Sequence, residues 1–453
     1  MNEIGIATSN DNNKSMTLQD VVTLVRQGEM AKAADILHAF IQSQFNLELS
    51  DNAVTIRKDT ISLNSVNGFI KAQDSTIYFF KFHLEEDESD TVSEYYNAAL
   101  LEKAGYPVEK PLCASTTPGE QILIYPYVEH ERLFDACLRN ENLNTDEANH
   151  LAAAQADLDR LCFEKTKQTL HVGSQQDYQS LSLLQLFYWR LVDANTPNKL
   201  GGRHARFYKD QTFEFPNGLK LHYDVLSNLK WNINGVSYDK TFEQSFTEAR
   251  NILSPAAIDS YAACTAHGDA HNGNVWFCSD KDTPSLSYFD PAFAGDKIPV
   301  LLAEIKTTFH NIFAHPLWLY DAQGADANLM VKAKTEGGVL YVEHDWTLTK
   351  LREEFISSKI EHFWKPALRL LQDEKLLPDH WEDIIRAALF CCPTLVMNLR
   401  ANADKNQSAA QNIHTPKTSL LGLSIAMMCA AKPVNEQDLI SDFIQRIDPN
   451  QKP

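Results

Sequence analysis

The spacing of apolar residues changes along this chain, and the change limits the fold more than any other feature of the sequence. Between about Ala53 and His83, apolar side chains alternate with polar ones or form short β-branched and aromatic runs, which predicts three antiparallel strands. Turns are expected at Ser65–Gly68 and Gln73–Ser75, where Ser, Asn, Asp and Gly gather. Beyond about residue 130, apolar residues recur mostly at helical spacing. The sequence therefore predicts an α+β fold with a small β-rich first lobe and a large, mainly helical second lobe.

Individual elements can be placed within this outline. We expect helices over about 16–44, Thr91–Ala104 (closed by Gly105), Asp146–Val192, Tyr238–Leu253 and most of the chain after Val300. Gln121–Val128 predicts a further strand, and Asn234-Gly235 predicts a hairpin turn inside an irregular insert at 195–239. We expect a tail at 1–15, a first lobe at 16–128 and a second lobe at 129–453.

Charge and cysteine usage exclude several classes of function. The chain carries 41 basic and 60 acidic residues, a formal net charge of -19, which argues against a nucleic-acid partner. The same balance fits a cationic substrate, and high solubility explains it equally well. The eight cysteines form no CxxC pair, so we expect reduced thiols and no zinc framework. The polar N-terminus is no secretory signal. The longest apolar stretches, around Ala387–Leu399 and Leu420–Ala431, are too short to cross a bilayer and predict buried helices. We therefore expect a cytoplasmic protein that does not contact a membrane. The sequence leaves its oligomeric state undecided.

The segment with the strongest chemical signal is Thr265–Val275, with the sequence TAHGDAHNGNV. It places Asp269 five residues before Asn274, in a glycine-containing loop that we expect to follow a helix and to lead into a strand. Phosphoryl transfer needs a carboxylate that takes the proton of an acceptor hydroxyl, and a neutral oxygen ligand for Mg²⁺. The catalytic loops of protein kinases separate their Asp and Asn by this interval. Asp269 is thus the candidate catalytic base and Asn274 a candidate metal ligand.

Asp290 is the second candidate metal ligand. It follows two apolar runs, NVWFC and SLSYF, which are separated by the polar segment SDKDTP and predict a hairpin. Such a hairpin returns Asp290 to the neighbourhood of Asn274. A metal ion held by both residues would neutralise charge on the phosphates during transfer.

The first lobe supplies candidates for nucleotide binding. Lys81 lies on the third expected strand, where kinases carry a lysine that binds the α- and β-phosphates of ATP. Glu94, early in the next helix, is the expected ion-pair partner of this lysine, and Glu102 is the alternative. The segment from Ile124, including Tyr125 and Tyr127, occupies the place of the linker whose backbone pairs with adenine.

His267–Asn274 followed by Phe289-Asp290-Pro291 resembles the motif of the aminoglycoside phosphotransferase and choline kinase-like enzymes. The resemblance implies a two-lobed protein-kinase-like fold, with ATP and Mg²⁺ as cofactors. It implies Asp269 as the base, Asn274 and Asp290 as metal ligands, and Lys81 with Glu94 as the nucleotide-binding pair. One departure is that the acidic residue expected soon after Gly295-Asp296 is replaced by Val300 or displaced to Glu304.

The expected activity is transfer of the γ-phosphate of ATP to a hydroxyl of a small molecule. No APE-like motif follows Asp290, which disfavours a protein substrate. A metal-dependent phosphoester hydrolase and an inactive nucleotide-binding regulator are the alternatives. The acceptor stays open among amino sugars, amino alcohols, sugars and nucleoside derivatives. The roles of His271 and of the insert at 195–239 also stay open, whereas we expect His267 to shape the loop by a hydrogen bond.

Overall fold

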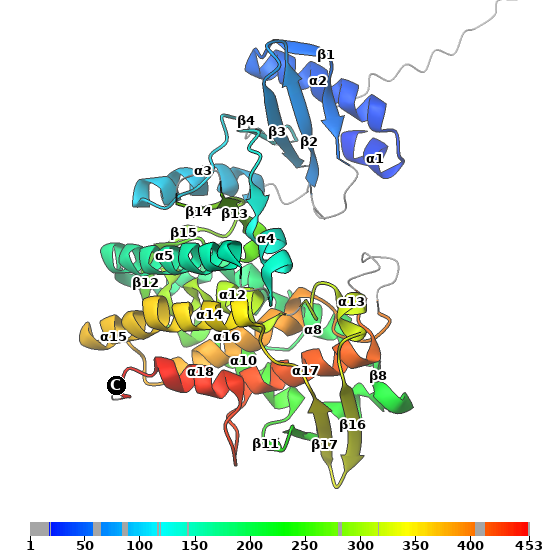
Figure 1. Cartoon of the computed structure of the whole chain (residues 1–453), viewed down its shortest axis with the longest axis vertical. Helices are drawn as coiled ribbons and strands as arrows, with labels where there is room; N and C mark the ends of the chain where they lie inside the picture. Colours follow the sequence, from blue (N-terminus) through cyan, green and yellow to red (C-terminus); the bar gives the residue numbers. More distant parts are fainter. Residues whose placement is uncertain are drawn as a thin grey trace, which may run out of the picture. The chain divides into compact units, whose positions relative to one another are not determined.

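The chain divides into two compact units, each with its own apolar core. The computed structural model describes residues 18, 20–57, 65–83, 89–115, 117, 119–142, 145–279, 283–315, 317–403 and 413–451. The first unit comprises Met1–Tyr95 and Lys110–Glu129, and the second comprises Tyr96–Glu109 and His130–Pro453. Separate clusters of buried apolar side chains form the two cores. A β-rich unit and a mainly helical unit confirm the predicted α+β composition (Figure 1).

The first unit is built on an antiparallel five-stranded sheet with the strand order β1-β2-β3-β5-β4. Ala33, Leu37 and Ile41 recur at four-residue spacing on α2 and are buried, which gives this helix one apolar face. The elements are α1 (Asp20–Arg26), α2 (Met30–Phe45), β1 (Leu49–Ile56), β2 (Ser65–Ala72), β3 (Ile77–His83), β4 (Cys113–Ser115) and β5 (Ile122–Pro126).

Two details of this unit differ from the sequence-based expectation. The helix expected over 16–44 is wrong as one element, because Gly28 adopts a positive φ of 81° and separates α1 from α2. The turn expected at Ser65–Gly68 is also wrong, because these residues form the first half of β2. Gly68 is needed there for close packing, since a Cβ atom would lie 2.0 Å from the carbonyl oxygen of Thr55 and 2.6 Å from the ring of Phe80.

Other expected elements of this part of the chain are confirmed. Three antiparallel strands precede α3 (Ser89–Ala104), and Gly105 ends that helix with a φ of 89°. The turn at Gln73–Ser75 is present, with Ser75 at a φ of 74°. The strand predicted over Gln121–Val128 is β5, which ends at Pro126.

The second unit is mainly helical. The region Asp146–Val192 is mainly helical, as expected: α5 ends at Thr169, and shorter helical elements follow the short strand His171–Ser174. The helices are α4 (Leu133–Asn140), α5 (Asp146–Thr169), α6 (Gln175–Gln179), η1 (Ser182–Leu186), α7 (Tyr188–Leu191), α8 (Gly202–Phe207), η2 (Pro216–Gly218), α9 (Tyr223–Leu226), α10 (Phe242–Ile252), η3 (Pro255–Ala257), η4 (Asn272–Asn274), α11 (Val300–Ala303), α12 (Ile305–Thr308), η5 (Phe309–Phe313), α13 (Ala322–Asp326), α14 (Lys350–Ser358), η6 (Lys359–Trp364), α15 (Lys365–Asp373), α16 (Trp381–Val396), α17 (Pro416–Ala430) and α18 (Leu439–Ile447).

Small sheets are set among these helices. Their strand orders are β11-β10-β17-β16, β15-β12-β7, β14-β13-β6 and β8-β9. The hairpin predicted at Asn234-Gly235 joins β10 to β11 and is confirmed. The strands are β6 (Glu131–Arg132), β7 (His171–Ser174), β8 (Thr212–Glu214), β9 (Lys220–His222), β10 (Lys230–Ile233), β11 (Val236–Tyr238), β12 (Ser260–Ala266), β13 (Val275–Cys278), β14 (Ser285–Tyr288), β15 (Gly295–Pro299), β16 (Val331–Glu336) and β17 (Val339–His344).

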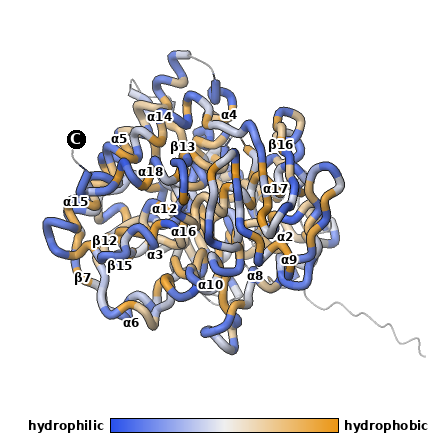
Figure 2. The backbone as a smooth tube through the Cα atoms, turned by 90° about the horizontal axis from the view of Figure 1, so that it is seen from below, coloured by the Kyte–Doolittle hydropathy of each residue, from blue (hydrophilic) through white to orange (hydrophobic). Residues whose placement is uncertain are grey.

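The most apolar helices lie at the centre of the second unit. Every residue of α17 from Thr418 to Ala430 is buried, and Figure 2 shows this segment as predominantly hydrophobic. Helix α16 is buried almost continuously from Ile385 to Leu395. Both segments were predicted as buried helices. Among the described residues, no helix combines the length and apolar character that a membrane span requires.

Candidate active site

The segment that carries Asp269 follows a strand, not the helix expected from the sequence. Strand β12 pairs with β7 and β15 and ends at Ala266. At Gly268 the φ is 76°, and a Cβ there would lie 3.0 Å from the carbonyl oxygen of Phe293. A side chain is therefore excluded on steric and conformational grounds. Glycine is what allows the loop to turn sharply next to the segment that follows Asp290.

The predicted hairpin is present and brings Asp290 beside Asn274. Strands β13 and β14 pair antiparallel, with Val275 opposite Tyr288. One step further, the N–H of Phe289 donates to the carbonyl oxygen of Asn274 at 3.1 Å. Asp290 follows directly, with a φ of 54° that non-glycine residues adopt only when the surroundings hold them there. The hairpin thus joins two of the predicted metal ligands, while its residues 280–282 lie outside the described part.

Hydrogen bonds within the loop fix Asp269 and Asn274 relative to each other. The amide Nδ2 of Asn274 donates to the carbonyl oxygen of Asp269 at 2.9 Å. This use of the NH₂ group leaves the amide oxygen of Asn274 as an acceptor. Carboxylate and amide oxygens, the types that Asp290 and Asn274 carry, are ligands that Mg²⁺ favours. Among the described residues, no group of three or more His, Cys, Asp and Glu could hold a metal by itself.

His267 connects the loop to the end of the hairpin, as predicted. Its Nδ1 accepts the N–H of Asp269 at 3.3 Å, so its Nε2 carries the proton and donates to the carbonyl oxygen of Phe289 at 3.1 Å. Burial lowers the pKa of His267 and favours this neutral form. His271 also holds the loop by a hydrogen bond, because its Nδ1 accepts the N–H of Gly273 at 3.1 Å.

Lys306 is a neighbour of Asp269 that the sequence interpretation missed. Its Nζ lies 3.6 Å from Oδ1 of Asp269, and both side chains are largely buried. Within the described residues, no hydrogen bond reaches that carboxylate oxygen. Nζ of Lys306 also donates to Nε2 of His310 at 2.8 Å, and Nδ1 of His310 pairs with the hydroxyl of Tyr320. The available signal was the presence of Lys306 and His310 at i and i+4 in the segment VLLAEIKTTFHNIFA.

A buried ionic cluster supports the segment that bears Lys306. Nζ of Lys359 lies 2.6 Å from Oδ1 of Asp159 and 2.8 Å from Oε2 of Glu304. Asp159 also accepts hydrogen bonds from Gln155 and Ser358, at 2.8 and 2.6 Å. Glu304 thus anchors the chain between Asp290 and Lys306 to η6.

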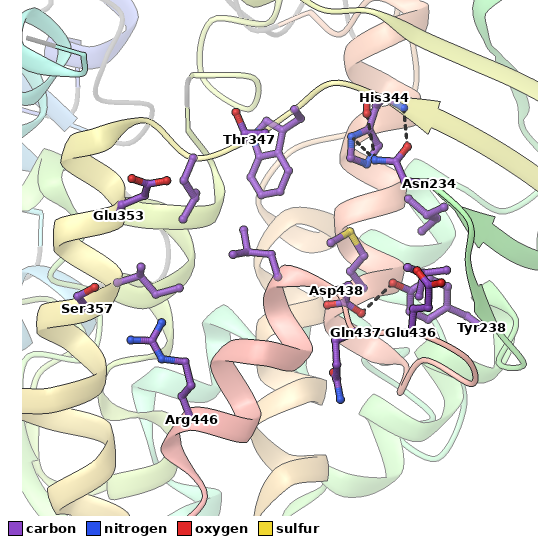
Figure 3. A pocket seen from close by; sticks show the side chains of 17 residues that line it. Asn234, Tyr238, His344, Thr347, Glu353, Ser357, Glu436, Gln437, Asp438 and Arg446 are labelled. Carbon is purple, nitrogen blue, oxygen red and sulfur yellow. Dashed lines mark hydrogen bonds between the residues drawn. The ribbon is translucent and has the colours of Figure 1, made fainter. Parts of the chain in front are cut away.

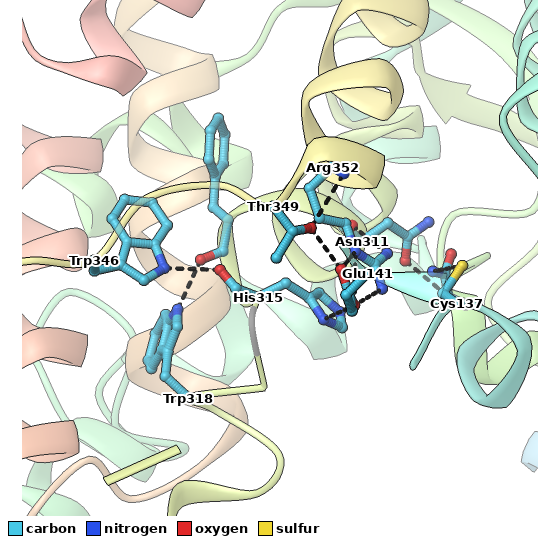
Figure 4. Close-up of polar contacts among 10 residues, drawn as sticks. Cys137, Glu141, Asn311, His315, Trp318, Trp346, Thr349 and Arg352 are labelled. Carbon is cyan, nitrogen blue, oxygen red and sulfur yellow. Dashed lines mark hydrogen bonds and ion pairs between the residues drawn. The ribbon is translucent and has the colours of Figure 1, made fainter. Parts of the chain in front are cut away.

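A second buried network reaches the loop that follows Asp269 through Asn311 of η5 (Figure 4). The guanidinium of Arg352 donates to Glu141 from Nε at 3.0 Å and from Nη2 at 2.5 Å. Its Nη1 donates to the carbonyl oxygen of Asn311 at 2.7 Å. The side-chain oxygen of Asn311 in turn accepts the N–H of Asn272 at 2.7 Å. Glu141 and Arg352 therefore reach the catalytic loop through a single asparagine.

The predicted nucleotide-binding residues belong to the first unit or to α3. Lys81 lies in β3 between Asn67 of β2 and Leu123 of β5. Ile124 and Tyr125 are buried in β5, and Tyr127 follows that strand with 42% of its surface exposed. Glu94 lies in α3, but its side chain is outside the described part of the structure.

A cavity of about 600 Å³ lies elsewhere in the second unit (Figure 3). Its walls come from the β10–β11 hairpin, the segment after β17, and helices α14, α17 and α18. Asp269, Asn274 and Asp290 do not line it.

No protein-family model and no curated protein matches the sequence. Among solved structures, the amicoumacin kinase hAmiN in complex with AMP-PNP, Ca²⁺ and Ami matches 91% of this chain and 98% of its own, at 14% identity and a TM-score of 0.46. A macrolide 2'-phosphotransferase type I matches 79% of this chain and 96% of its own, at 13% identity and a TM-score of 0.34. The GDP and kanamycin complex of APH(2")-IIia matches 79% of this chain and 89% of its own, at 10% identity and a TM-score of 0.37. The three proteins are phosphotransferases by name, like the enzymes whose motif the segment around Asp269 resembles. Because all three TM-scores are below 0.5, these likenesses assign no activity to the chain.

Proposed function

We propose that the chain is an ATP- and magnesium-dependent kinase that phosphorylates a hydroxyl group of a small molecule. Asp269 is the proposed base, and Asn274 and Asp290 are the proposed metal ligands. The observation that carries the proposal is the joining of these residues by the loop and the β13–β14 hairpin. Asn274 bonds to the backbone of Asp269 through its side chain and to the residue before Asp290 through its backbone.

The proposed reaction forms a bond from the acceptor oxygen to the γ-phosphorus and breaks the bond from that phosphorus to the bridging β–γ oxygen. ADP leaves, and the carboxylate of Asp269 takes the proton of the hydroxyl. When bound, Mg²⁺ supplies positive charge that stabilises the phosphates during transfer. The chain itself contributes orientation, because the hydrogen bonds of His267 and Asn274 fix the loop before any ligand binds.

For the nucleotide, we propose the residues expected from the sequence. Lys81 binds the α- and β-phosphates with Glu94 as its partner, and the backbone around Ile124, Tyr125 and Tyr127 pairs with adenine. The position of Lys81 on a central strand of the sheet supports this role, because its backbone is held on both sides by β2 and β5.

The test is ADP formation from Mg·ATP by the full chain with a panel of hydroxylated metabolites and antibiotics, together with mass detection of the phosphorylated product. Product formation that requires an acceptor supports the proposal. Release of phosphate from phosphoesters without nucleotide would favour the hydrolase alternative. Nucleotide binding without turnover of any acceptor would favour the regulator.

A further inference from the structure

Three arginines lie close together on the short helices α7 and α8 of the second unit. Arg190 is on α7, and Arg203 and Arg206 are on α8. The two helices are in close contact, because a Cβ atom at Gly202 would lie 2.6 Å from the carbonyl oxygen of Arg190. The N–H of Gly201 also donates to the carbonyl oxygen of Leu191 at 2.8 Å. The arrangement is therefore fixed by the backbone.

Among the described residues, no carboxylate makes an ion pair with these arginines, although the charge of Asp269 acts on Arg190. Nη1 of Arg203 donates to the carbonyl oxygens of Leu395 and Val396 at 2.6 and 3.1 Å, and Arg206 lies over the ring of Phe207. Within the described part of the chain, the guanidinium of Arg190 makes no hydrogen bond and no ion pair. A guanidinium cluster without an ion-paired carboxylate is unexpected in a chain with 60 acidic residues.

The positive charges of these arginines also repel one another. Burial, together with the positive charges of Arg190 and Arg206, lowers the pKa of Arg203 to about 10. Burial also lowers the pKa of Arg190, and the charge of Arg206 acts in the same direction. Partly buried cations without partners cost folding free energy, and an anion placed among them would recover it.

The cluster lies near Asp269, the proposed base. Helix η1 leads directly into α7, and its residue Leu183 would be 2.9 Å from a Cβ at Gly268. The charge of Asp269 raises the pKa of Arg190. The charges of Lys306, Asp269 and Arg190 all act on the pKa of the Cys392 thiol of α16, which places these groups around one side chain.

We propose that Arg190, assisted by Arg206, binds an anionic group of the acceptor, so that the substrate is a hydroxylated carboxylic acid or phosphate monoester. This inference rests on the proposed kinase function. The planar guanidinium presents paired N–H donors that match the two oxygens of a carboxylate or phosphate. The net charge of the whole chain is compatible with a cationic acceptor, but the charge next to the proposed base favours an anionic one.

The experiment compares acceptors that share a carbon skeleton and differ in charge. The three-carbon set is glycerol, D-glycerate, glycerol 3-phosphate and serinol, and the six-carbon set is glucose, gluconate, glucose 6-phosphate and glucosamine. ADP formation is measured with the wild type, Arg190→Gln and Arg206→Gln. Arg160→Gln is the matched control, because Arg160 is an exposed arginine of α5 that is paired with Asp157.

We expect an anionic member of a set to have a kcat/KM at least about tenfold above its neutral and cationic counterparts. Arg190→Gln should raise the KM for that acceptor about tenfold or more and leave the KM for ATP within about twofold. Because the guanidinium of Arg190 makes no hydrogen bond to the described residues and its burial is unfavourable, this variant should unfold at the same temperature as the wild type or a higher one.

A preference for the neutral or cationic member, with ADP formed, would overturn the inference and leave the kinase function standing. An effect of Arg190→Gln on the KM for ATP instead of the acceptor would also overturn it. If no acceptor leads to ADP formation, the kinase proposal fails. Calorimetric titration of D-glycerate and glycerol 3-phosphate then tests separately whether the arginine cluster binds anions. Binding that is lost in Arg190→Gln and kept in Arg160→Gln supports the site, and equal or absent binding in all three proteins refutes it.

Discussion

Lys359 offers a sharp test of how the chain between Asp290 and Lys306 is supported. Its side chain is 3% exposed, and it lies within 2.8 Å of two carboxylates, Asp159 and Glu304, that are 0% and 5% exposed. The variant Lys359→Met keeps the apolar stem and removes the charge. It leaves two buried carboxylates that share one site without a cation.

Breaking a buried ion pair from one side costs about 3–5 kcal/mol, which is a large part of a typical folding stability of about 5–15 kcal/mol. Lys365→Met is the matched control, because Lys365 begins the next helix and pairs with Glu361 at 3.4 Å near the surface. That pair should contribute at most about 1 kcal/mol. Urea unfolding followed by tryptophan fluorescence measures both variants against the wild type.

The pH dependence of the free energy of unfolding gives a second, independent test of this ionic cluster. Burial raises the pKa of Asp159, and the charge of Lys359 opposes that effect. Without Lys359 the folded state favours a protonated Asp159, so the stability deficit of Lys359→Met should shrink as the pH falls from 7 towards 5. Adding Asp159→Asn should recover part of the loss. A deficit equal to that of Lys365→Met, with no pH dependence, would refute this account of the cluster.

Three further predictions concern the metal, the nucleotide and acid stability. Asp290→Ala should abolish the Mg²⁺ dependence of nucleotide binding measured by calorimetry, and an unchanged Mg²⁺ titration would remove Asp290 from the metal site. Lys81→Ala should raise the KM for ATP or lower kcat by about tenfold or more, and unchanged kinetics would move phosphate binding elsewhere. Burial lowers the pKa of His315, His344 and His414 from 6.5 to about 4. The unfolded chain therefore binds more protons between these values, and the free energy of unfolding should fall as the pH drops through this range, by up to about 3 kcal/mol per histidine. His414→Gln should flatten that pH dependence in equilibrium unfolding, and an unaltered slope would contradict the assignment.

The parts of the fold that depend on local sequence were predictable. The β13–β14 hairpin follows from two short apolar runs around a polar turn, and its register alone places Asp290 beside Asn274. The end of α3 at Gly105 and the hairpin turn at Asn234-Gly235 also follow from the local sequence, because these residues favour a positive φ.

The parts of the fold that depend on contacts between residues far apart in the sequence were not predictable. The region after Val300 was expected to be mainly helical, yet β16 and β17 form a hairpin there, and β17 pairs in parallel with β10 about a hundred residues earlier in the chain. Lys306 could not be assigned to Asp269 from spacing, because the contact depends on how α12 packs against the loop. The arginine cluster depends likewise on the contact of α7 with α8.

The most direct test of the central claim is the turnover number of Asp269→Asn, measured as acceptor-dependent ADP formation beside Asp259→Asn, an exposed aspartate just before β12. Loss of a general base predicts a fall in kcat of at least about a hundredfold for Asp269→Asn, in a variant that still unfolds cooperatively. Asp259→Asn should retain the wild-type rate. If Asp269→Asn turns over as fast as Asp259→Asn, Asp269 is not the base and the proposed centre is wrong.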